Sequence, residues 1–182
     1  MGELRPHKLV LPFYAVFSRH ESAFEWARQR LESSGRTIAC TSERFEFVQT
    51  DYYQREMGEG LLKQFWALSE LADAADLPDW KLESNRWEAE FTIDNAGEPR
   101  PLNIDPGYIT EAKLVLATTK DRDHRLYLRD GILAEVTTYY HRGEWRSRPW
   151  TYPDYATDLC REFLTRCRER LRQQLRAADK GK

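Results

Sequence analysis

The stretch over residues 126–145 constrains the fold of this chain more than any other. An Asp-Gly dipeptide at 130–131 separates a short apolar run from a longer β-branched run over 132–139, and Arg-Gly at 142–143 precedes Trp145. Asp-Gly is a favoured dipeptide in the two-residue turns that join antiparallel strands. The sequence therefore predicts a three-stranded antiparallel meander, on which other parts of the chain must pack.

Helical periodicity predicts elements that cover such a sheet. A helix after residue 18 is indicated by a capping box of Ser18 and Glu21, by an apolar face and by Gly35 as a left-handed stop. A second helix is predicted over 61–69, behind two glycines. A long final helix from about residue 155 has one apolar stripe formed by Cys160, Phe163, Leu164, Cys167, Leu171 and Leu175.

Other segments favour strands and turns. Residues 8–17 are predicted to form a strand near an edge of the sheet, or one with a bulge at Pro12. Residues 37–40 and 45–48 are predicted to form one bent strand or two short ones. Turns are predicted at 95–99 and 105–107. Two segments are ambiguous. Residues 80–94 fit either a helix that follows Ser84 or a strand with alternating apolar residues, and we favour the strand. Residues 114–117 fit either a buried strand or a short helix capped by Thr110.

Together these patterns predict one α+β domain over residues 1–176, followed by a frayed tail over 177–182. A mixed, largely antiparallel sheet would be covered on one face by three main helices. The chain of 182 residues is long enough to bury a sizeable core.

Charge and cysteine content narrow the classes of function. A formal net charge of -2 gives no overall attraction to nucleic acid or to an anionic membrane. The three cysteines form neither a metal-binding pair nor an even disulfide framework, and we find no signal-like or membrane-spanning apolar run. We therefore expect a soluble, cytoplasmic protein in a reduced compartment that does not bind a membrane; the sequence predicts no oligomeric state.

Residues 103–125 contain more polar functionality than a turn needs. Arginine forks, lysine charges and threonine hydroxyls are groups that bind phosphate oxygens, and aromatic rings stack on bases or sugars. We therefore predict a site for a nucleotide or another phosphorylated small molecule. The candidate contacts are Asn103, Tyr108, Lys113, Thr118, Thr119, Lys120, Arg125, Tyr52, Tyr53 and Trp150. The alternative is that 120–123 is a solvated loop of alternating charge.

Carboxylates and one histidine supply the candidate catalytic groups, Glu135, Asp105 and His124. Glu135 interrupts an apolar strand, so it either pairs with a cation or works in a cleft. The cofactor is unknown, and a divalent cation such as Mg²⁺ is compatible with a site formed by Asp51, Asp105 and Glu135. Alternatively, the dipeptide that follows Asp105 makes it part of an ordinary Asp-Pro-Gly turn.

Two other function classes compete with a phosphate site. The final helix has many arginines on its polar side, which are typical of a solvated face but could contact an RNA or DNA backbone. A protein-interaction domain without a catalytic site is the third reading. A GTPase of the phosphate-loop type is disfavoured, because the glycine-rich loop is missing and the aspartate of Thr-Lys-Asp at 119–121 is out of register.

Several strings in the chain resemble those of a known prokaryotic family, the domain of unknown function family 4416. They are DYYxxEMG at 51–58, NIDPGY at 103–108, KLVLATTKD at 113–121, HRLYL at 124–128, AEVT at 134–137 and WTYPDY at 150–155. The resemblance implies a stand-alone bacterial or archaeal protein. Some members carry a GTP-binding label, and the family brings no catalytic residues.

Overall fold

Nine strands form one sheet in the computed structural model, which describes residues 3, 6–47, 56–95 and 99–180. The sheet order is β2-β4-β1-β5-β6-β8-β7, with β3 on β4 and β9 on β8, and every described pairing between these strands is antiparallel. The strands are β1 (Leu11–Ser18), β2 (Ile38–Thr41), β3 (Phe45–Glu46), β4 (Leu62–Leu68), β5 (Asn103–Ile109), β6 (Lys113–Thr118), β7 (Leu126–Arg129), β8 (Ile132–His141) and β9 (Glu144–Ser147).

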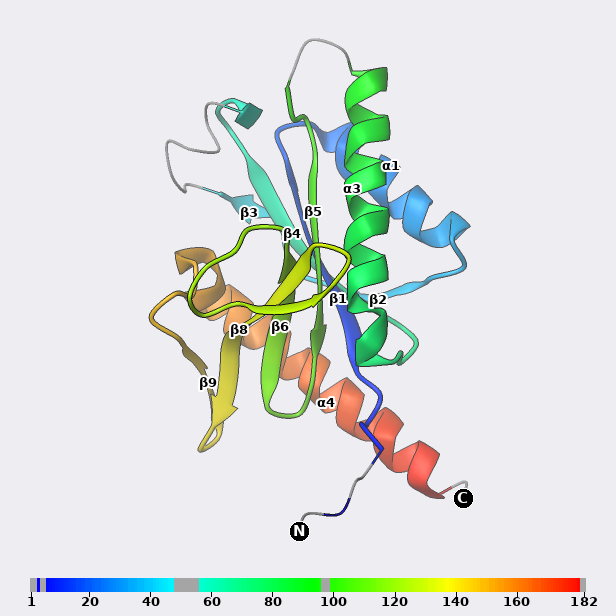
Figure 1. The fold of residues 1–182 in the computed structure, drawn as a ribbon, viewed down its shortest axis with the longest axis vertical. Helices are drawn as coiled ribbons and strands as arrows, with labels where there is room; N and C mark the ends of the chain where they lie inside the picture. Colours follow the sequence, from blue (N-terminus) through cyan, green and yellow to red (C-terminus); the bar gives the residue numbers. More distant parts are fainter. Residues whose placement is uncertain (1–2, 4–5, 48–55, 96–98, 181–182) are drawn as a thin grey trace.

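In the part of the chain that the structure describes, three helices pack on this sheet, α1 (Glu21–Ser33), α3 (Leu77–Asp94) and α4 (Asp158–Lys180). Figure 1 shows α3 alongside β5, and it shows α4 running obliquely across the sheet toward the C-terminus of the chain. The α+β class and the largely antiparallel sheet are therefore confirmed. Helix α4 extends four residues beyond the domain end expected at residue 176.

Strand β1 lies in the middle of the sheet, between β4 and β5. The expectation that it lies near an edge was wrong. Pro12 is tolerated because it stands at the start of the strand: it lies opposite Tyr108 of β5, and the pairing with β4 begins only at Phe13. All eight residues of β1 are buried, so the strand needs cover on both faces.

Two apolar cores cover β1, one on each face of the sheet. Alternate residues of β1 point to opposite faces: Tyr14 and Val16 join the core under α1 and α3, whereas Phe13 and Ala15 join the core under α4. The prediction that all helices cover one face was therefore wrong. The predicted apolar stripe of α4 is confirmed, because Phe163 and its neighbours on that stripe fill the second core.

Helix α1 is confirmed, with Gly35 at φ +82° after its end, but its start differs from the prediction. Ser18 belongs to β1, and its hydroxyl donates to the Pro101 carbonyl and accepts from the backbone N–H of His20. His20 is the residue before the helix and makes no side-chain cap. The predicted capping box does not form.

One predicted helix is a strand in the structure, and one predicted strand is a helix. Residues 62–68 form strand β4 instead of a helix, and 77–94 form helix α3 instead of the favoured strand. The alternation in 87–93 misled the prediction, because Ile93 is 76% exposed. The residues that α3 buries follow helical spacing instead: Leu77, Trp80, Lys81, Ser84, Trp87 and Phe91.

The Asp-Pro-Gly sequence at 105–107 lies inside β5, so the turn predicted there was wrong. Residues 113–118 form strand β6, and the Thr110 hydroxyl accepts from the N–H groups of Ala112 and Lys113 in the turn before it. The predicted turn at 95–99 lies largely outside the described residues.

The meander that joins β7, β8 and β9 is confirmed. Asp130 and Gly131 have φ of +53° and +76°, and Arg142 and Gly143 have +49° and +92°. Positive φ at both central residues is the conformation of a type I′ turn. The short strands β2 and β3 also form where they were expected. No helix in the described part of the chain is long and apolar enough to cross a membrane.

Candidate functional site

The sheet opens where β5 and β6 separate. Their pairing ends at Gly107 opposite Leu116, after which β6 stays paired with β8 and β5 stays paired with β1. Gly107 sits at the last point of contact, where an added Cβ would lie 2.4 Å from the Val115 carbonyl oxygen. Only glycine lets the two backbones approach this closely before they diverge.

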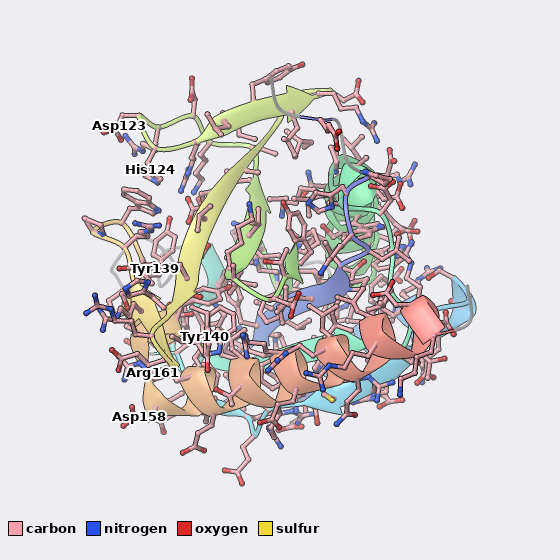
Figure 2. All side chains as sticks on the ribbon, turned by 90° about the horizontal axis from the view of Figure 1, so that it is seen from below. Asp123, His124, Tyr139, Tyr140, Asp158 and Arg161 are labelled. Carbon is pink, nitrogen blue, oxygen red and sulfur yellow. The ribbon has the colours of Figure 1, made fainter. Side chains whose placement is uncertain are left out.

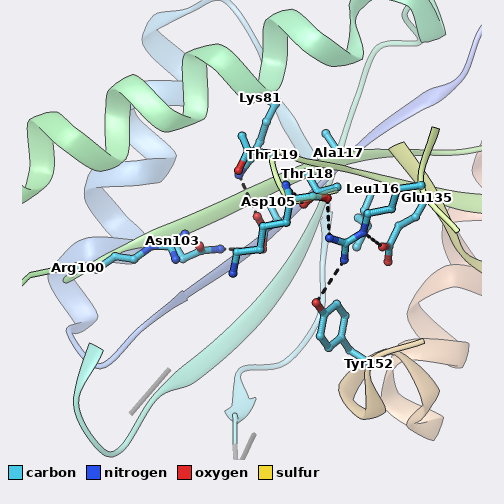
Figure 3. Close-up of a pocket in the computed structure, with 12 residues that line it drawn as sticks. Lys81, Arg100, Asn103, Asp105, Leu116, Ala117, Thr118, Thr119, Glu135 and Tyr152 are labelled. Atoms are coloured by element: carbon cyan, nitrogen blue, oxygen red, sulfur yellow. Dashed lines mark hydrogen bonds and ion pairs between the residues drawn. The ribbon is translucent and has the colours of Figure 1, made fainter. Parts of the chain in front are cut away.

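A pocket of about 80 Å³ occupies this opening. It contains seven of the residues that the sequence singled out: Asn103, Asp105, Thr118, Thr119, Lys120, Arg125 and Glu135. Lys81, Arg100, Leu116, Ala117 and Tyr152 complete the lining (Figure 3).

Where β5 no longer pairs with β6, side chains of α3 make the hydrogen bonds to its backbone. The backbone N–H of Ile104 donates to Glu88 Oε1 at 2.8 Å, and the Ile104 carbonyl accepts from Lys81 Nζ at 3.2 Å. An unpaired backbone group in the interior would be destabilising. The helix therefore stabilises the opened edge of β5 and places a lysine at the pocket.

The wall formed by β5 and α3 is an ionic network. Lys81 Nζ lies 3.0 Å from Asp105 Oδ1, and Asn103 Nδ2 donates to Asp105 Oδ2 at 2.8 Å. Arg100 bonds both Asn103 and Glu88. Burial by itself would raise the pKa of Asp105, but the cations around it, Lys81 foremost, bring that pKa below its usual value. Asp105 is therefore an ionised carboxylate at neutral pH.

Glu88 differs from Asp105 although both contact Lys81. Burial raises the pKa of Glu88 above its usual value, and Lys81 and Arg100 offset this only in part. The two carboxylates thus have pKa shifts of opposite sign within one network.

The opposite wall centres on Glu135, whose side chain is only 2% exposed. Its Oε2 accepts from Arg125 Nε at 2.7 Å and lies 3.2 Å from His124 Nε2. Arg125 also donates to the Lys120 carbonyl at 2.8 Å and reaches the Tyr152 hydroxyl at 3.5 Å. The first of the two readings of Glu135, a carboxylate paired with a cation, is what the structure contains.

With this geometry in place, comparison with known proteins identifies the family. A family model described as "Domain of unknown function (DUF4416)" matches residues 8–171. The chain belongs to the DUF4416 family. No curated protein and no solved structure gives a match.

Three predicted ligand contacts of this DUF4416 protein lie away from the pocket. Lys113 is at the other end of β6, opposite Tyr139, and Tyr108 packs against the core under α1 and α3, where burial raises its pKa. Trp150 stacks on His124, with 4.8 Å between ring centroids, and donates to the Val136 carbonyl. One face of the Trp150 ring is therefore covered by the imidazole.

His124 also lies outside the pocket lining, although it contacts Glu135. Its Nδ1 is 3.1 Å from Asp123 Oδ1, and Figure 2 shows these two residues at one end of the molecule, well apart from α4. Asp51, Tyr52 and Tyr53 lie outside the described residues. Within the described residues, no group of three or more His, Cys, Asp or Glu side chains is arranged to hold a metal ion.

Four residues of the DUF4416 site escaped the sequence reasoning: Lys81, Glu88, Arg100 and Tyr152. Lys81 and Glu88 share the buried face of α3, one of them beside Trp80 and the other beside Trp87. A lysine between buried aromatic positions signals a buried ion pair once the segment is read as a helix. Tyr152 belongs to an aromatic cluster that the sequence shows, but nothing local connects it with Arg125.

Five of the six arginines of α4 contact groups of the protein itself. Arg168 donates to the Glu111 carbonyl at 2.7 Å and lies over the Tyr140 ring, and Arg161 pairs with Asp158 at the start of the helix. Arg166, Arg170 and Arg172 contact Thr41, Ser69 and Glu111. Nucleic-acid binding by this helix stays a prediction.

Proposed function

We propose that this DUF4416 protein binds a small phosphorylated molecule in the pocket between β5 and β6. The observation that supports this is the charge of the site: four lining cations, Lys81, Arg100, Lys120 and Arg125, stand against the lining carboxylates Asp105 and Glu135 and against Glu88, which pairs with Lys81 and Arg100 from α3. An excess of cationic groups in a concave, partly desolvated site favours an anion. Phosphate is the anion whose oxygens match lysine, arginine and hydroxyl donors.

The lining residues have two different roles in this proposal. Lys81 and Arg125 are buried against carboxylates, so they fix the shape and the charge of the walls. Thr119 and Lys120 are exposed and Thr118 is half-buried at the end of β6. These three residues form the part of the site that meets a ligand from solvent.

The size of the pocket selects the recognised group. At about 80 Å³ it is well below the roughly 300 Å³ at which pockets for complete drug-sized ligands begin. It therefore accommodates a phosphate group and its nearest atoms, with the remainder of the ligand outside. Nucleotides fall within this proposal as one class of phosphate ester.

We assign Asp105 and Glu135 to holding the cationic walls and not to proton transfer. Each carboxylate bonds a cation, and Asp105 also accepts from Asn103. A general base needs an oxygen within reach of a substrate proton. The proposed function is therefore stated as binding of a phosphorylated ligand.

A thermal-shift screen tests this function directly. The panel comprises inorganic phosphate, glycerol 3-phosphate and nucleoside monophosphates, each with and without Mg²⁺. A ligand at a hundredfold above its dissociation constant stabilises the native state by about 2.7 kcal/mol. If none of these compounds raises Tm, the proposal is wrong.

Two lysines of the same strand region provide a matched pair of variants. We expect Lys120→Gln to weaken binding of the best phosphate ester about tenfold, because one charge-assisted contact is lost. Lys113→Gln removes the same charge at the other end of β6 and should leave the affinity unchanged. Titration calorimetry measures both, and equal effects of the two substitutions would contradict the assignment.

A further inference from the structure

A second, smaller cavity of about 40 Å³ adjoins the pocket between β5 and β6. The two share Asp105, Leu116 and Tyr152 as common walls. The other walls are aromatic rings, among them Phe17 and Phe47, together with one ion pair. A ligand group that extends past these shared residues would enter a cavity lined by aromatic rings and by the Lys63–Asp154 ion pair.

The ion pair is formed by Lys63 of β4 and Asp154, which precedes α4. Lys63 Nζ lies 2.6 Å from Asp154 Oδ2, and both side chains are only 4% exposed. Four rings surround the ammonium group at 4.5 to 5.7 Å, those of Phe17, Phe47, Phe65 and Tyr155. The lysine is therefore held in place by its carboxylate and by cation–π contacts.

The other oxygen of this carboxylate is unsatisfied. Asp154 Oδ1 is buried and has no hydrogen-bond partner among the described residues. A buried acceptor without a donor destabilises the native state, and such groups in native proteins are usually met by water, an ion or a ligand. The cavity that Asp154 lines is where such a donor would sit.

The surroundings specify the kind of donor. The charge of Asp154 is already balanced by Lys63, so a second cation would be in excess and a neutral donor suffices. A water molecule takes about 30 Å³ of liquid volume, so the cavity accommodates one small group. The aromatic walls pack against the C–H faces of a hydroxylated carbon chain.

We propose that the ligand is a phosphate ester of a polyhydroxy compound. Its phosphate occupies the main pocket, and one of its hydroxyl groups passes Tyr152 and donates to Asp154 Oδ1. This inference rests on the proposed function, and it narrows the ligand class to polyol and sugar phosphates in preference to alkyl phosphates. A site built to bond a hydroxyl discriminates strongly against an analogue that lacks it, because the acceptor is then left unpaired.

Titration calorimetry of the intact protein with two probes tests the inference. Glycerol 3-phosphate and n-propyl phosphate carry the same phosphate on a three-carbon chain and differ in their hydroxyl groups. We expect glycerol 3-phosphate to bind at least about tenfold more tightly. Equal binding would overturn this inference and leave the proposed function standing, whereas no binding of either probe would overturn both.

Two variants connect the discrimination to Asp154. The double variant Lys63→Met with Asp154→Leu replaces a buried ion pair by apolar groups of similar size, which buried pairs often tolerate. In this double variant the ratio of the affinity for glycerol 3-phosphate to that for n-propyl phosphate should fall to about one. The affinity for n-propyl phosphate itself should stay the same. Phe47→Trp narrows the cavity without altering the ion pair and should lower the ratio in the same way. A ratio that persists in Phe47→Trp would place the hydroxyl contact elsewhere and overturn the inference.

Discussion

The two ends of β6 each have a lysine, Lys113 in the strand and Lys120 just after it, but they differ in their surroundings. Residues 114–116 pair with β5 on one side and β8 on the other, whereas Ala117 and Thr118 pair with β8 alone. A lysine lies at each end, yet only Lys120 lines the pocket, and Lys113 does not. The comparison shows that the departure of a neighbouring strand, and not the local sequence, creates the site.

The largest expected effect concerns the side chain that stabilises the opened end. Lys81→Met leaves the half-buried Asp105 without its ammonium partner and removes the donor to the Ile104 carbonyl. Removing one partner of a buried ion pair costs about 3–5 kcal/mol. We expect a loss of that size in the free energy of unfolding, measured in urea.

Lys113→Met is the control at the paired end. Lys113 is only half-buried, and its replacement should change stability by no more than about 0.5 kcal/mol. Similar losses for the two lysines would mean that the two ends of β6 do not differ as described.

A smaller effect is expected at the point where the strands part. In Gly107→Ala the new Cβ would meet the Val115 carbonyl oxygen at 2.4 Å and Leu116 Cδ2 at 2.7 Å, so the backbone of β6 must shift. Such overpacking costs about 1–3 kcal/mol, and contact with backbone favours the upper end of this range. Urea unfolding measures the loss, and the shift should also weaken phosphate-ester binding.

Gly131→Ala separates crowding from backbone strain. No heavy atom lies within 4 Å of the Cβ position at Gly131, but φ is +76°. Strain of this kind costs about 1 kcal/mol. If Gly107→Ala is no more destabilising than this control, the close approach of β5 and β6 is not required for the opening.

The smallest effect is a dependence of stability on pH that arises from two carboxyl groups at the open end. The pKa of Asp105 in the folded state is lowered, so its stabilising contribution is complete above the ordinary value of about 3.9 and is lost as pH falls through the folded pKa. Glu88 has a raised pKa, so its contribution has the opposite sign and is lost as pH rises through that pKa.

Urea unfolding between pH 5 and 2.5 tests these signs. The slope of the unfolding free energy against pH should flatten in Asp105→Asn and steepen in Glu88→Gln. An unchanged acid slope in Asp105→Asn would show that Lys81 does not hold this carboxylate in its ionised form.

The sequence predicted those parts of the fold that depend on neighbouring residues. The meander follows from two dipeptides whose central residues adopt positive φ, and α4 follows from a stripe that recurs every three or four residues. Strand β4 and helix α3 were assigned to the wrong type because their burial is decided by partners far away in the chain. A short apolar run such as 62–68 fits either type until its neighbours are known.

The candidate site divides in the same way. Its residues on β6 and β8 were found because Glu135 in an apolar strand and the polar end of 113–120 are visible locally. Lys81 and Arg100 were missed because they reach the pocket from α3 and from the segment before β5. The divergence of β5 from β6 is a tertiary event, and Gly107 is its only trace in the sequence that we can name.

The position of β1 sets an order on biosynthesis. Among the described strands β1 comes first in the chain, and its neighbours β4 and β5 and its cover α4 follow it in the sequence. The core that contains Phe13 and Ala15 is therefore complete only when residues near 171 have been synthesised. Long-range pairing of this kind slows folding and leaves apolar surface open to association. The chain is thus expected to depend on chaperones during its own translation more than a protein whose early strands pair with each other.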